Sequence, residues 1–569
     1  MHGRLKVKTT AEQQEAKRKE REKKLKVYSG ATQRIIQKRK DGEFDEEALE
    51  FTNQLLSANP DYYSLWNYRR EIFLELTKTS PSEDLQSRYS KELSFLESCL
   101  MVNPKSYGAW HHRCWVMEHM PEPDWSREVS LCNQYLEYDD RNFHCWDYRR
   151  FVVTKAKVEP AEELKFSTAK ISSNFSNYSS WHYRSKLLPV LYPDPENKGR
   201  IKEEILLQEY ELVQNAFFTD PNDQSGWFYH RWLLGRADKP QEVQLLYVSR
   251  NPARIIAVFA QPINLTENAS DISVTIDGEN SLGAWRNSQG TKDHALVWIH
   301  EVDADVLTNT ASHDVLISIK DATVDRQCSI PADENECWSR DTTDAMGLFS
   351  AQLSVEKSGV LTQELESCQQ LQELEPDNKW CLLTIILLMK AIDPLRYEEE
   401  TLSYFQTLLK TDPCREGYFK DLRSKFVIEN EITRNMQQIS TGSRELDLSN
   451  KHITNLCHTE LMVLMTQVNL SSNQLSSLKG CHALQCTRIL LADNNTLEDL
   501  TDLQHLPDLE TLSVKNNSIK TVQTLHALQS CVRLHRLDLT SNPICDIPEF
   551  KARVKEVLPK LVSLNGETI

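Results

Sequence analysis

Long apolar stretches are absent from the sequence. The longest apolar run, Trp380–Met389, has about half the length that a membrane-spanning helix requires. The N-terminal stretch MHGRLKVKTT has no apolar core of the kind that a secretory signal carries. We therefore expect a cytoplasmic protein that is not integral to a membrane.

Closely spaced cysteine pairs and a general excess of basic residues are also missing. The 14 cysteines are scattered and never form a CxxC pair, which favours reduced thiols over a disulfide framework or a zinc ribbon. The net charge is −17; the basic segment 1–40 carries +10, so the rest of the chain carries −27. An acidic body argues against nucleic acid as a partner. Lys and Arg alternate with Glu over residues 17–26, a pattern typical of a solvated helix. His2 is interpreted as an exposed terminal residue.

The sequence contains a repeated tryptophan motif. The chain of 569 residues is long enough for three or more domains. Five segments align, and NPKSYGAWHHRCWVM, which starts at Asn103, represents them. Their tryptophans, separated by 44, 36, 35 and 46 residues, are Trp66, Trp110, Trp146, Trp181 and Trp227. The arginines that follow three residues later are Arg69, Arg113, Arg149 and Arg184, and the fifth slips one place to Arg231.

Each repeat is predicted to form a helical hairpin. Asn or Asp followed by Pro or another breaker is typical of a helix start, and Trp and Arg three residues apart lie on one helical face. Amphipathic stretches such as 46–56 and 92–100 precede the motifs. Stacked hairpins bury a face that none could bury alone, so we expect an α-α superhelical solenoid with the Trp and Arg side chains in its core.

The periodicity changes from helix to strand near residue 240. Ile272, Val274 and Ile276 alternate with polar residues and end at the hairpin signal Asp277-Gly278. Further strand candidates are 255–259, 295–298 and 315–319. Residues 241–350 are therefore predicted to form an Ig-like β-sandwich. It is inserted between helical repeats 1–5 (41–240) and repeats 6–7 (351–441), where Trp380 restores the motif although Leu383 replaces the arginine.

A third periodicity occupies residues 442–569. Five segments fit LxLxxNxL and start at Leu446, Val468, Ile489, Leu512 and Leu537, with spacings of 22, 21, 23 and 25. This interval is typical of leucine-rich repeats. The asparagine position, which hydrogen-bonds the tight turns of such a stack, is assigned to Asn473, Asn494, Asn517 and Asn542, with Lys451 in the first copy. The predicted fold class is therefore multidomain and mainly α, with an inserted sandwich and a C-terminal leucine-rich domain.

The helical repeats, with their Asn-Pro-x-x-Tyr-x-x-Trp-x-x-Arg signature, resemble those of protein prenyltransferase alpha subunits. The resemblance covers roughly 44–240 and 353–430. Within that family, an inserted sandwich followed by leucine-rich repeats resembles the Rab geranylgeranyltransferase type. The resemblance implies transfer of geranylgeranyl from its diphosphate to C-terminal cysteines of Rab GTPases, which a Rab escort protein presents. It also implies a beta subunit that binds the inner surface of the solenoid and holds zinc, with magnesium as a further candidate cofactor.

The resemblance also implies which residues of this chain meet the diphosphate at the subunit interface. The lysine of its Asn-Pro-Lys repeat matches Lys105, with Tyr107 beside it, and a Tyr-His pair matches Phe143-His144, where the tyrosine hydroxyl is missing. Positive and hydrogen-bonding groups suit a leaving diphosphate. His111, His112 and Cys114 do not make a convincing zinc set, because adjacent histidines point in different directions on a helix and no further ligand is suitably spaced.

Two other functions fit parts of the same pattern. A non-enzymatic interaction scaffold would also combine three protein-binding architectures without an active site of its own. An alpha subunit of a farnesyl or type-1 geranylgeranyl transferase would share the helical part, although those subunits lack the two additional domains. Capture of a zinc-containing beta subunit distinguishes the first alternative, and substrate choice distinguishes the second.

Overall fold

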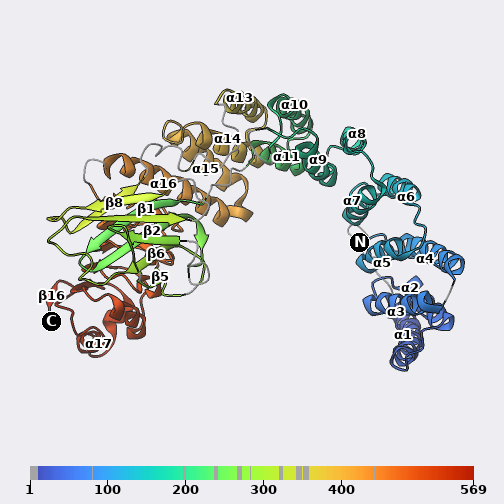
Figure 1. The fold of residues 1–569 in the computed structure, drawn as a ribbon, viewed down its shortest axis with the longest axis horizontal. Helices are drawn as coiled ribbons and strands as arrows, with labels where there is room; N and C mark the ends of the chain where they lie inside the picture. Colours follow the sequence, from blue (N-terminus) through green and yellow to red (C-terminus); the bar gives the residue numbers. More distant parts are fainter. Residues whose placement is uncertain are drawn as a thin grey trace. The chain divides into compact units, whose positions relative to one another are not determined.

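The computed structural model describes residues 11–79, 81–195, 200–235, 241–265, 272–281, 283–291, 293–319, 325–340, 349, 358–439 and 443–569. Within these ranges the chain forms two compact units, 1–213 and 214–569 (Figure 1). His2 lies outside the described residues. No helix in the described ranges combines the length and the apolar character needed to cross a membrane.

The first unit is a series of helical hairpins that follow one long basic helix, α1 (Ala11–Lys40). Most of α1 is exposed, and Ile35 near its end is buried against the first hairpin. The hairpins are α2 (Glu46–Ala58) with α3 (Tyr63–Thr79), α4 (Ser82–Val102) with α5 (Tyr107–His119), α6 (Trp125–Tyr138) with α7 (Phe143–Ala156), and α8 (Pro160–Ser173) with α9 (Tyr178–Leu191). The next helix, α10 (Glu203–Thr219), crosses the boundary between the units.

The repeated motif accounts for these helices. Each signature tryptophan is buried, and its indole N–H donates to the backbone carbonyl six residues earlier, as Trp110 does to Pro104 at 2.8 Å. Asn142 and Asn177 cap α7 and α9 by accepting hydrogen bonds from the first backbone N–H groups. The tryptophan therefore closes the loop before its own helix while packing in the core. The predicted hairpins are confirmed.

In the second unit the helical repeats continue on both sides of a β-sandwich. They comprise α11 (Gln224–Leu234), α13 (Ser358–Leu374), α14 (Lys379–Ile392), α15 (Glu398–Thr411), the short η2 (Pro413–Arg415) and α16 (Glu416–Ile439). Asn378, the cap of α14, donates to the carbonyl of Pro221 before α11 at 2.8 Å. Trp380 is half-buried there and packs against Phe228. The repeats before and after the insertion are thus joined directly.

The inserted region forms two antiparallel sheets. One has the order β5-β6-β2-β1-β9 and the other β4-β3-β7-β8. The strands are β1 (Val243–Arg250), β2 (Ala253–Ile263), β3 (Ile272–Ile276), β4 (Glu279–Asn280), β5 (Trp285–Asn287), β6 (Ala295–Glu301), β7 (His313–Ile319), β8 (Arg326–Ile330) and β9 (Glu336–Arg340). The predicted turn at Asp277-Gly278 joins β3 to β4 with both residues at positive φ. Against the expectation of reduced thiols throughout, Cys328 and Cys337 form a disulfide between β8 and β9, while the other 12 cysteines are free.

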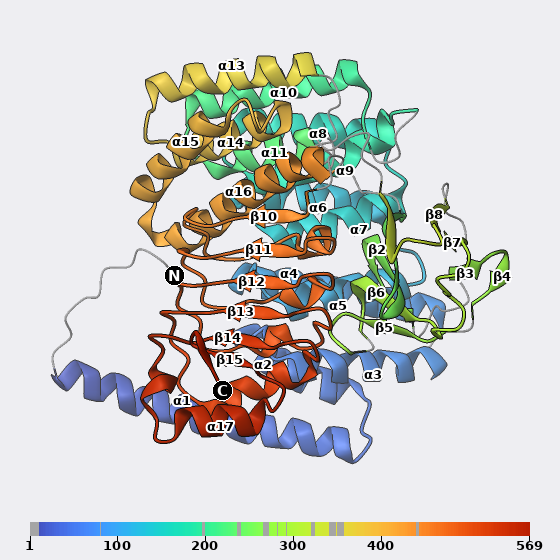
Figure 2. The same cartoon turned by 90° about the vertical axis from the view of Figure 1, so that its left-hand side faces the viewer.

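The leucine-rich domain is a ladder of short strands (Figure 2). Its strands β10 to β15 are parallel, and β16 pairs with β15 in the antiparallel sense. They are β10 (Glu445–Asp447), β11 (Gln467–Asn469), β12 (Ile489–Leu491), β13 (Thr511–Ser513), β14 (Arg536–Asp538), β15 (Ser563–Leu564) and β16 (Glu567–Thr568). The connections contain η3 (Thr459–Met462), η4 (Cys481–Ala483), η5 (Thr501–Leu503), η6 (Val522–Ser530), η7 (Pro543–Asp546) and α17 (Phe550–Val557).

The assignment of Asn494 to the asparagine ladder is wrong. Asn494 is exposed and has a positive φ, whereas its neighbour Asn495 is buried and donates to the carbonyls of Leu470 and Ala492 at 3.1 and 3.2 Å. The buried ladder is Asn473, Asn495, Asn517 and Asn542. The error came from the register, because Leu490 and not Ile489 pairs with Val468 and Leu512.

The insertion and the leucine-rich domain share one apolar core. Tyr247, Ile256 and Val258, on the five-stranded sheet, pack with the leucines of the repeats. Arg254 forms a buried ion pair with Asp508 at 2.5 Å across this contact. The opposite face of the same sheet packs on the four-stranded sheet, so its two faces are both covered.

Candidate functional site

The structure brings the three candidate catalytic residues together at the starts of two neighbouring helices. Lys105 lies in the loop before α5, Tyr107 is the first residue of α5, and His144 is the second residue of α7. The rings of Tyr107 and His144 meet edge to face with centroids 4.2 Å apart. Lys105 Nζ lies 3.5 Å from a carboxylate oxygen of Asp139, in the loop before α7. The four side chains form one polar cluster.

Side chains in the two loops hold this cluster in place. Asn103 Oδ1 accepts the backbone N–H of Lys105 at 3.1 Å, which tightens the turn before α5. Asn142 caps α7 by accepting from the backbone of His144 and donates its own amide N–H to the carbonyl of Pro104 at 2.9 Å. One asparagine therefore fixes the loop that carries Lys105 relative to the helix that carries His144.

The cluster combines exposed and buried groups. The side chain of Lys105 is 60% exposed, and Tyr107 is 58% exposed, while only 6% of His144 is exposed. Both helices direct the partial positive charge of their first N–H groups toward this end. An exposed ammonium group and a phenol thus stand at the surface beside a buried histidine.

The electrostatic surroundings keep His144 neutral. Burial lowers the pKa of His144; the nearby carboxylate of Asp147 acts in the opposite direction, and the ammonium of Lys105 lowers this pKa further. At neutral pH the imidazole therefore carries one N–H donor and one acceptor nitrogen. Together the three residues offer a positive charge, a hydroxyl and a neutral donor, which are groups suited to bind an anion with several oxygens.

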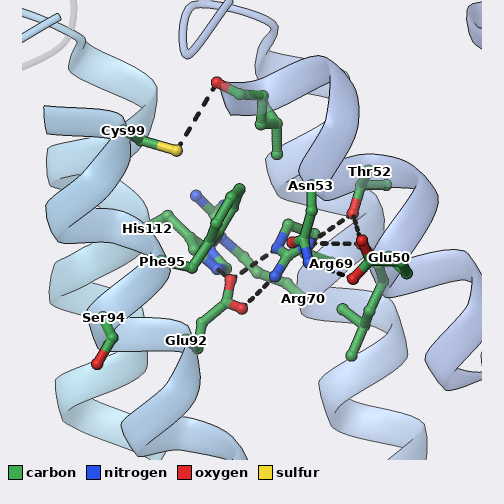
Figure 3. A network of polar contacts seen from close by, with 12 residues as sticks. Glu50, Thr52, Asn53, Arg69, Arg70, Glu92, Ser94, Phe95, Cys99 and His112 are labelled. Carbon is green, nitrogen blue, oxygen red and sulfur yellow. Dashed lines mark hydrogen bonds and ion pairs between the residues drawn. The ribbon is translucent and has the colours of Figure 1, made fainter. Parts of the chain in front are cut away.

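Buried ion pairs hold the helices that carry this cluster. The signature arginine of one hairpin donates to a glutamate on the first helix of the next, as Arg69 Nε does to Glu92 at 2.7 Å (Figure 3). The same contact recurs, at 2.7 or 2.8 Å from Nε, in Arg113–Glu128, Arg149–Glu163 and Arg184–Glu209. Burial opposes the charge on Arg113, but Glu128 and its neighbours raise the pKa of this guanidinium above its usual value.

These glutamates are not among the residues predicted from the sequence, although a signal for them exists. Glu92, Glu128, Glu163 and Glu209 each lie 18 residues before the signature tryptophan of their own repeat. An acidic residue recurring at a fixed distance from a buried tryptophan, within an otherwise amphipathic helix, marks a position that faces the neighbouring arginine.

The fifth motif uses a histidine where the first four use arginine. His230 is buried, and its Nε2 lies 2.7 Å from Glu364 on α13. Arg231, which the alignment had placed in this role, is only half-buried. Since His230 is the residue three positions after Trp227, the motif keeps its spacing and changes its residue type.

His111, His112 and Cys114 lie on α5 and serve different contacts. His112 is buried between Trp66 and Glu92, whose carboxylate lies 2.8 Å from its Nε2, while His111 faces Arg70. Burial raises the pKa of the Cys114 thiol to about 12. Among the described residues, no group of three or more His, Cys, Asp or Glu side chains is placed to hold a metal ion.

Comparison with known proteins first defines a class. Five stretches, 45–76, 89–120, 125–156, 160–191 and 206–237, match the protein prenyltransferase alpha subunit repeat. Residues 243–343 match the Rab geranylgeranyl transferase alpha-subunit insert domain. The class is thus that of prenyltransferase alpha subunits that carry this insertion, as the resemblance predicted.

Relatives along the whole chain narrow the class to one family. The geranylgeranyl transferase type-2 subunit alpha of Homo sapiens is 50% identical over 568 residues, which cover 99% of this chain and 100% of that protein. Its Dictyostelium discoideum counterpart is 42% identical over 236 residues, 41% of this chain and 75% of that protein. The chain belongs to the family of geranylgeranyl transferase type-2 alpha subunits. A solved structure of Candida albicans protein geranylgeranyltransferase-I complexed with GGPP is 16% identical with a TM-score of 0.39, over 70% of this chain and 91% of that chain.

Proposed function

We propose that this chain is the alpha subunit of a heterodimer that transfers geranylgeranyl from geranylgeranyl diphosphate to C-terminal cysteines of Rab GTPases. The observation that carries the proposal is the 50% identity to the human type-2 alpha subunit along the whole chain. This identity includes the inserted sandwich and the leucine-rich domain, which farnesyl and type-1 geranylgeranyl transferase alpha subunits lack. A Rab escort protein presents the substrate in this proposal, and the reaction takes place in the cytoplasm.

The cluster around Lys105 would hold the leaving diphosphate. Lys105 contributes a positive charge and can turn from Asp139 toward a stronger anion, because its side chain is exposed and the ion pair, at 3.5 Å, is long and therefore weak. The hydroxyl of Tyr107 and the N–H of the neutral His144 imidazole each donate a hydrogen bond to the diphosphate. Charge that develops on the leaving oxygens would thereby be stabilised by one ammonium group and two neutral hydrogen-bond donors.

A separate beta subunit would supply the zinc that activates the thiol of the substrate. The described residues do not suit that ion, since His112 contacts Glu92, burial raises the pKa of the Cys114 thiol, and no described cluster offers three ligands. Magnesium likewise finds no described set of carboxylates here. The chemistry of this chain in the proposal is restricted to binding the diphosphate and supporting its partner.

Exposed aromatic side chains at the starts of successive helices support the proposed contact with the beta subunit. Tyr63, Tyr107, Phe143 and Tyr178 begin α3, α5, α7 and α9, and each is about half exposed. A row of large apolar groups at one end of a helical array is typical of the centre of a permanent interface.

We propose the same division of the chain that its periodicities predict. Residues 1–40 form a basic segment, 41–240 helical repeats 1–5, 241–350 the sandwich, 351–441 repeats 6–7 and 442–569 the leucine-rich repeats. The element boundaries support this division, since α11 ends at Leu234 and β1 begins at Val243.

Co-expression with a candidate beta subunit tests the proposed function. The complex is purified through a tag on this chain, and transfer of labelled geranylgeranyl to an escorted Rab is measured, with this chain alone as the control. We expect a zinc-containing complex with activity and none for the chain alone. A chain that captures no beta subunit would instead support the scaffold function, and preference for farnesyl diphosphate would support the farnesyltransferase alternative.

A further inference from the structure

In the first unit, the first helix of each hairpin ends at an asparagine or aspartate that also closes the following turn. These capping residues are Asn59, Asn103, Asp139 and Asn174. The side-chain Oδ1 of each accepts the backbone N–H two residues later, at 3.1 to 3.3 Å. Because an amide and a carboxylate both provide this oxygen, the turn requires only one oxygen of Asp139.

The second polar atom of the capping side chain distinguishes Asp139 from the three asparagines. In each asparagine this atom is Nδ2, which donates to an oxygen of an earlier element. The acceptors are the hydroxyl of Tyr28 and the carboxylates of Asp61 and Asp140, at 3.0, 2.9 and 2.7 Å. In Asp139 the second atom is Oδ2, which lies 3.5 Å from Nζ of Lys105. Among these four turns, the polarity of the contact is therefore reversed only at Asp139.

The charge of Asp139 is matched to Lys105 and not to the turn. With its Oδ1 kept in the turn, an asparagine at position 139 would present an N–H group to the ammonium of Lys105, which has donors and no acceptor. In the described part of the chain, Lys105 has no second ion pair. Asp139 is thus the carboxylate that holds this ammonium as long as no other anion is bound.

The geometry allows the ion pair to open. At 3.5 Å, the two atoms are farther apart than in a strong charge-assisted hydrogen bond. The side chains of Lys105 and Asp139 are 60% and 37% exposed, so water screens their attraction. A diphosphate carries several negative charges and attracts the same ammonium more strongly. Lys105 can therefore exchange between Asp139 and a bound diphosphate.

We propose that Asp139 competes with the diphosphate for Lys105 and thereby speeds the release of the diphosphate product, an inference that rests on the proposed function. The ammonium leaves Asp139 when geranylgeranyl diphosphate binds and returns to it when inorganic diphosphate departs. The competition weakens the binding of substrate and product by the same factor. The substrate is also held by its long apolar chain, whose burial contributes affinity that inorganic diphosphate lacks. Asp139 is thus a positioning residue that acts through Lys105.

Binding of inorganic diphosphate to the complex of this chain with its beta subunit tests the proposal. Asp139→Asn keeps the oxygen that closes the turn and removes the competing charge. We expect Kd for diphosphate to fall about threefold, as the loss of one exposed ion pair implies. The rate of diphosphate release after a single turnover should fall by the same factor. Both changes concern the affinity for the product, which a purely structural role of Asp139 would not strengthen.

Asp220→Asn is the matched control. Asp220 is exposed and closes the turn after α10 in the same way, since its Oδ1 accepts the backbone N–H of Asn222 at 3.1 Å. The variant removes the same charge from a different repeat and should leave diphosphate binding and release unchanged. Equal effects of the two variants would mean that diphosphate responds only to the net charge of the chain, and the proposal would be wrong.

A double-mutant cycle separates competition for Lys105 from direct repulsion of the diphosphate. In the Lys105→Ala background, Asp139→Asn should lose most of its effect on diphosphate binding, because no ammonium remains to be shared. Equal tightening in both backgrounds would show that Asp139 acts by repulsion alone.

Two further results would overturn the proposal. Unchanged diphosphate binding in Asp139→Asn would mean that the ion pair does not compete, and weaker binding would mean that Asp139 holds Lys105 toward the diphosphate. The unmutated complex tests the proposed function separately. If it transfers geranylgeranyl while Asp139→Asn behaves as the parent does, only the competition is excluded; if it transfers nothing, the proposed function and this inference are both wrong.

Discussion

At the scale of single residues, the Lys105 cluster distinguishes one helical repeat from the others. All four complete motifs of the first unit place an aromatic side chain at the start of the second helix, but only the second has a lysine two residues before it and a histidine from the next helix against its ring. In the proposed function, the repeat fixes the positions of these side chains and Lys105, Tyr107 and His144 bind the diphosphate.

Replacing Lys105 should affect turnover more than assembly. Lys105→Ala removes the positive charge nearest the proposed diphosphate and leaves the buried ion pairs intact. We expect kcat for geranylgeranyl transfer to fall on the order of 10²-fold, with little change in binding of the beta subunit. Lys91→Ala, an exposed lysine on α4, is the matched control. Equal turnover of the two variants would remove Lys105 from the site.

The buried pair of His112 and Glu92 predicts acid sensitivity in the first two repeats. Burial lowers the pKa of His112 from 6.5 to about 4, although its hydrogen bond to Glu92 partly opposes the change. Burial alone would raise the pKa of Glu92, but Arg69 and His112 bring it to about 2. Between pH 6.5 and 4, the unfolded chain therefore binds a proton at His112 that the folded chain does not bind.

Stability of this region should accordingly fall as the pH drops from 7 to 5. The measurement is the opening free energy of α5 amides by hydrogen exchange, corrected for the intrinsic exchange rate at each pH. His112→Gln, which keeps an N–H donor but does not titrate, should lose most of this dependence. His119→Gln, at an exposed position on the same helix, should retain it. The same pH dependence in all three proteins would assign the effect to other groups.

At the scale of elements, the asparagine ladder includes Asn495 but not its neighbour Asn494. Asn495→Ala leaves the buried N–H of Leu475 without its acceptor. It also removes one of the two hydrogen bonds that the carbonyls of Leu470 and Ala492 each accept from the asparagine ladder. We expect a loss of about 1–3 kcal/mol in the opening free energy of the surrounding strands, measured by hydrogen exchange. Asn494→Gly, which tolerates the positive φ at that position, should cost much less. Similar losses would contradict the corrected register.

Periodicity in the sequence was enough to predict the elements but not all of their contacts. The tryptophan spacing placed each hairpin, because a buried indole that closes its own loop tolerates little change in position. The Ile489 register was wrong because Ile489, Leu490 and Leu491 are all apolar, so alternation alone could not identify the inward residue. Leu446, Val468, Leu490 and Leu512 are spaced uniformly by 22 residues. This regularity identifies Leu490 as the inward residue.

The partners of the arginines could not be inferred from the motif because they lie on another hairpin. The separation from Arg69 to Glu92 is 23 residues, and that from Arg113 to Glu128 is 15, because α3 and α4 are longer than α5 and α6. The proposed site has the same origin: Lys105 and His144 become neighbours only through the stacking of α5 on α7. Individual residues at such sites were indicated by resemblance, while their mutual contacts required the structure.

At the scale of the whole molecule, the sandwich and the leucine-rich domain share one core, and this core determines which deletions leave apolar surface exposed. From the resemblance to prenyltransferase alpha subunits of the simpler type, we expect that neither domain is needed for transfer. In this chain, however, Tyr247, Ile256 and Val258 of the sandwich pack against the leucine-rich repeats, and Arg254 is paired with Asp508. Deletion of 442–569 alone would therefore expose an apolar sheet face and leave a buried arginine without its partner.

We expect the chain without 442–569 to aggregate, and a chain without both 241–357 and 442–569 to stay monodisperse in complex with the beta subunit. In the second variant a short Gly-Ser linker joins α11 to α13, which are already connected through the hydrogen bond between His230 and Glu364. Light scattering after size-exclusion chromatography measures the aggregation, and transfer per complex measures the chemistry.

Aggregation confined to the single deletion, with transfer within about twofold of the parent in the double deletion, would follow from the shared core. If the double deletion assembles but transfers nothing, the additional domains take part in the reaction; if the single deletion stays monodisperse, the apolar contact between sandwich and repeats does not protect the chain.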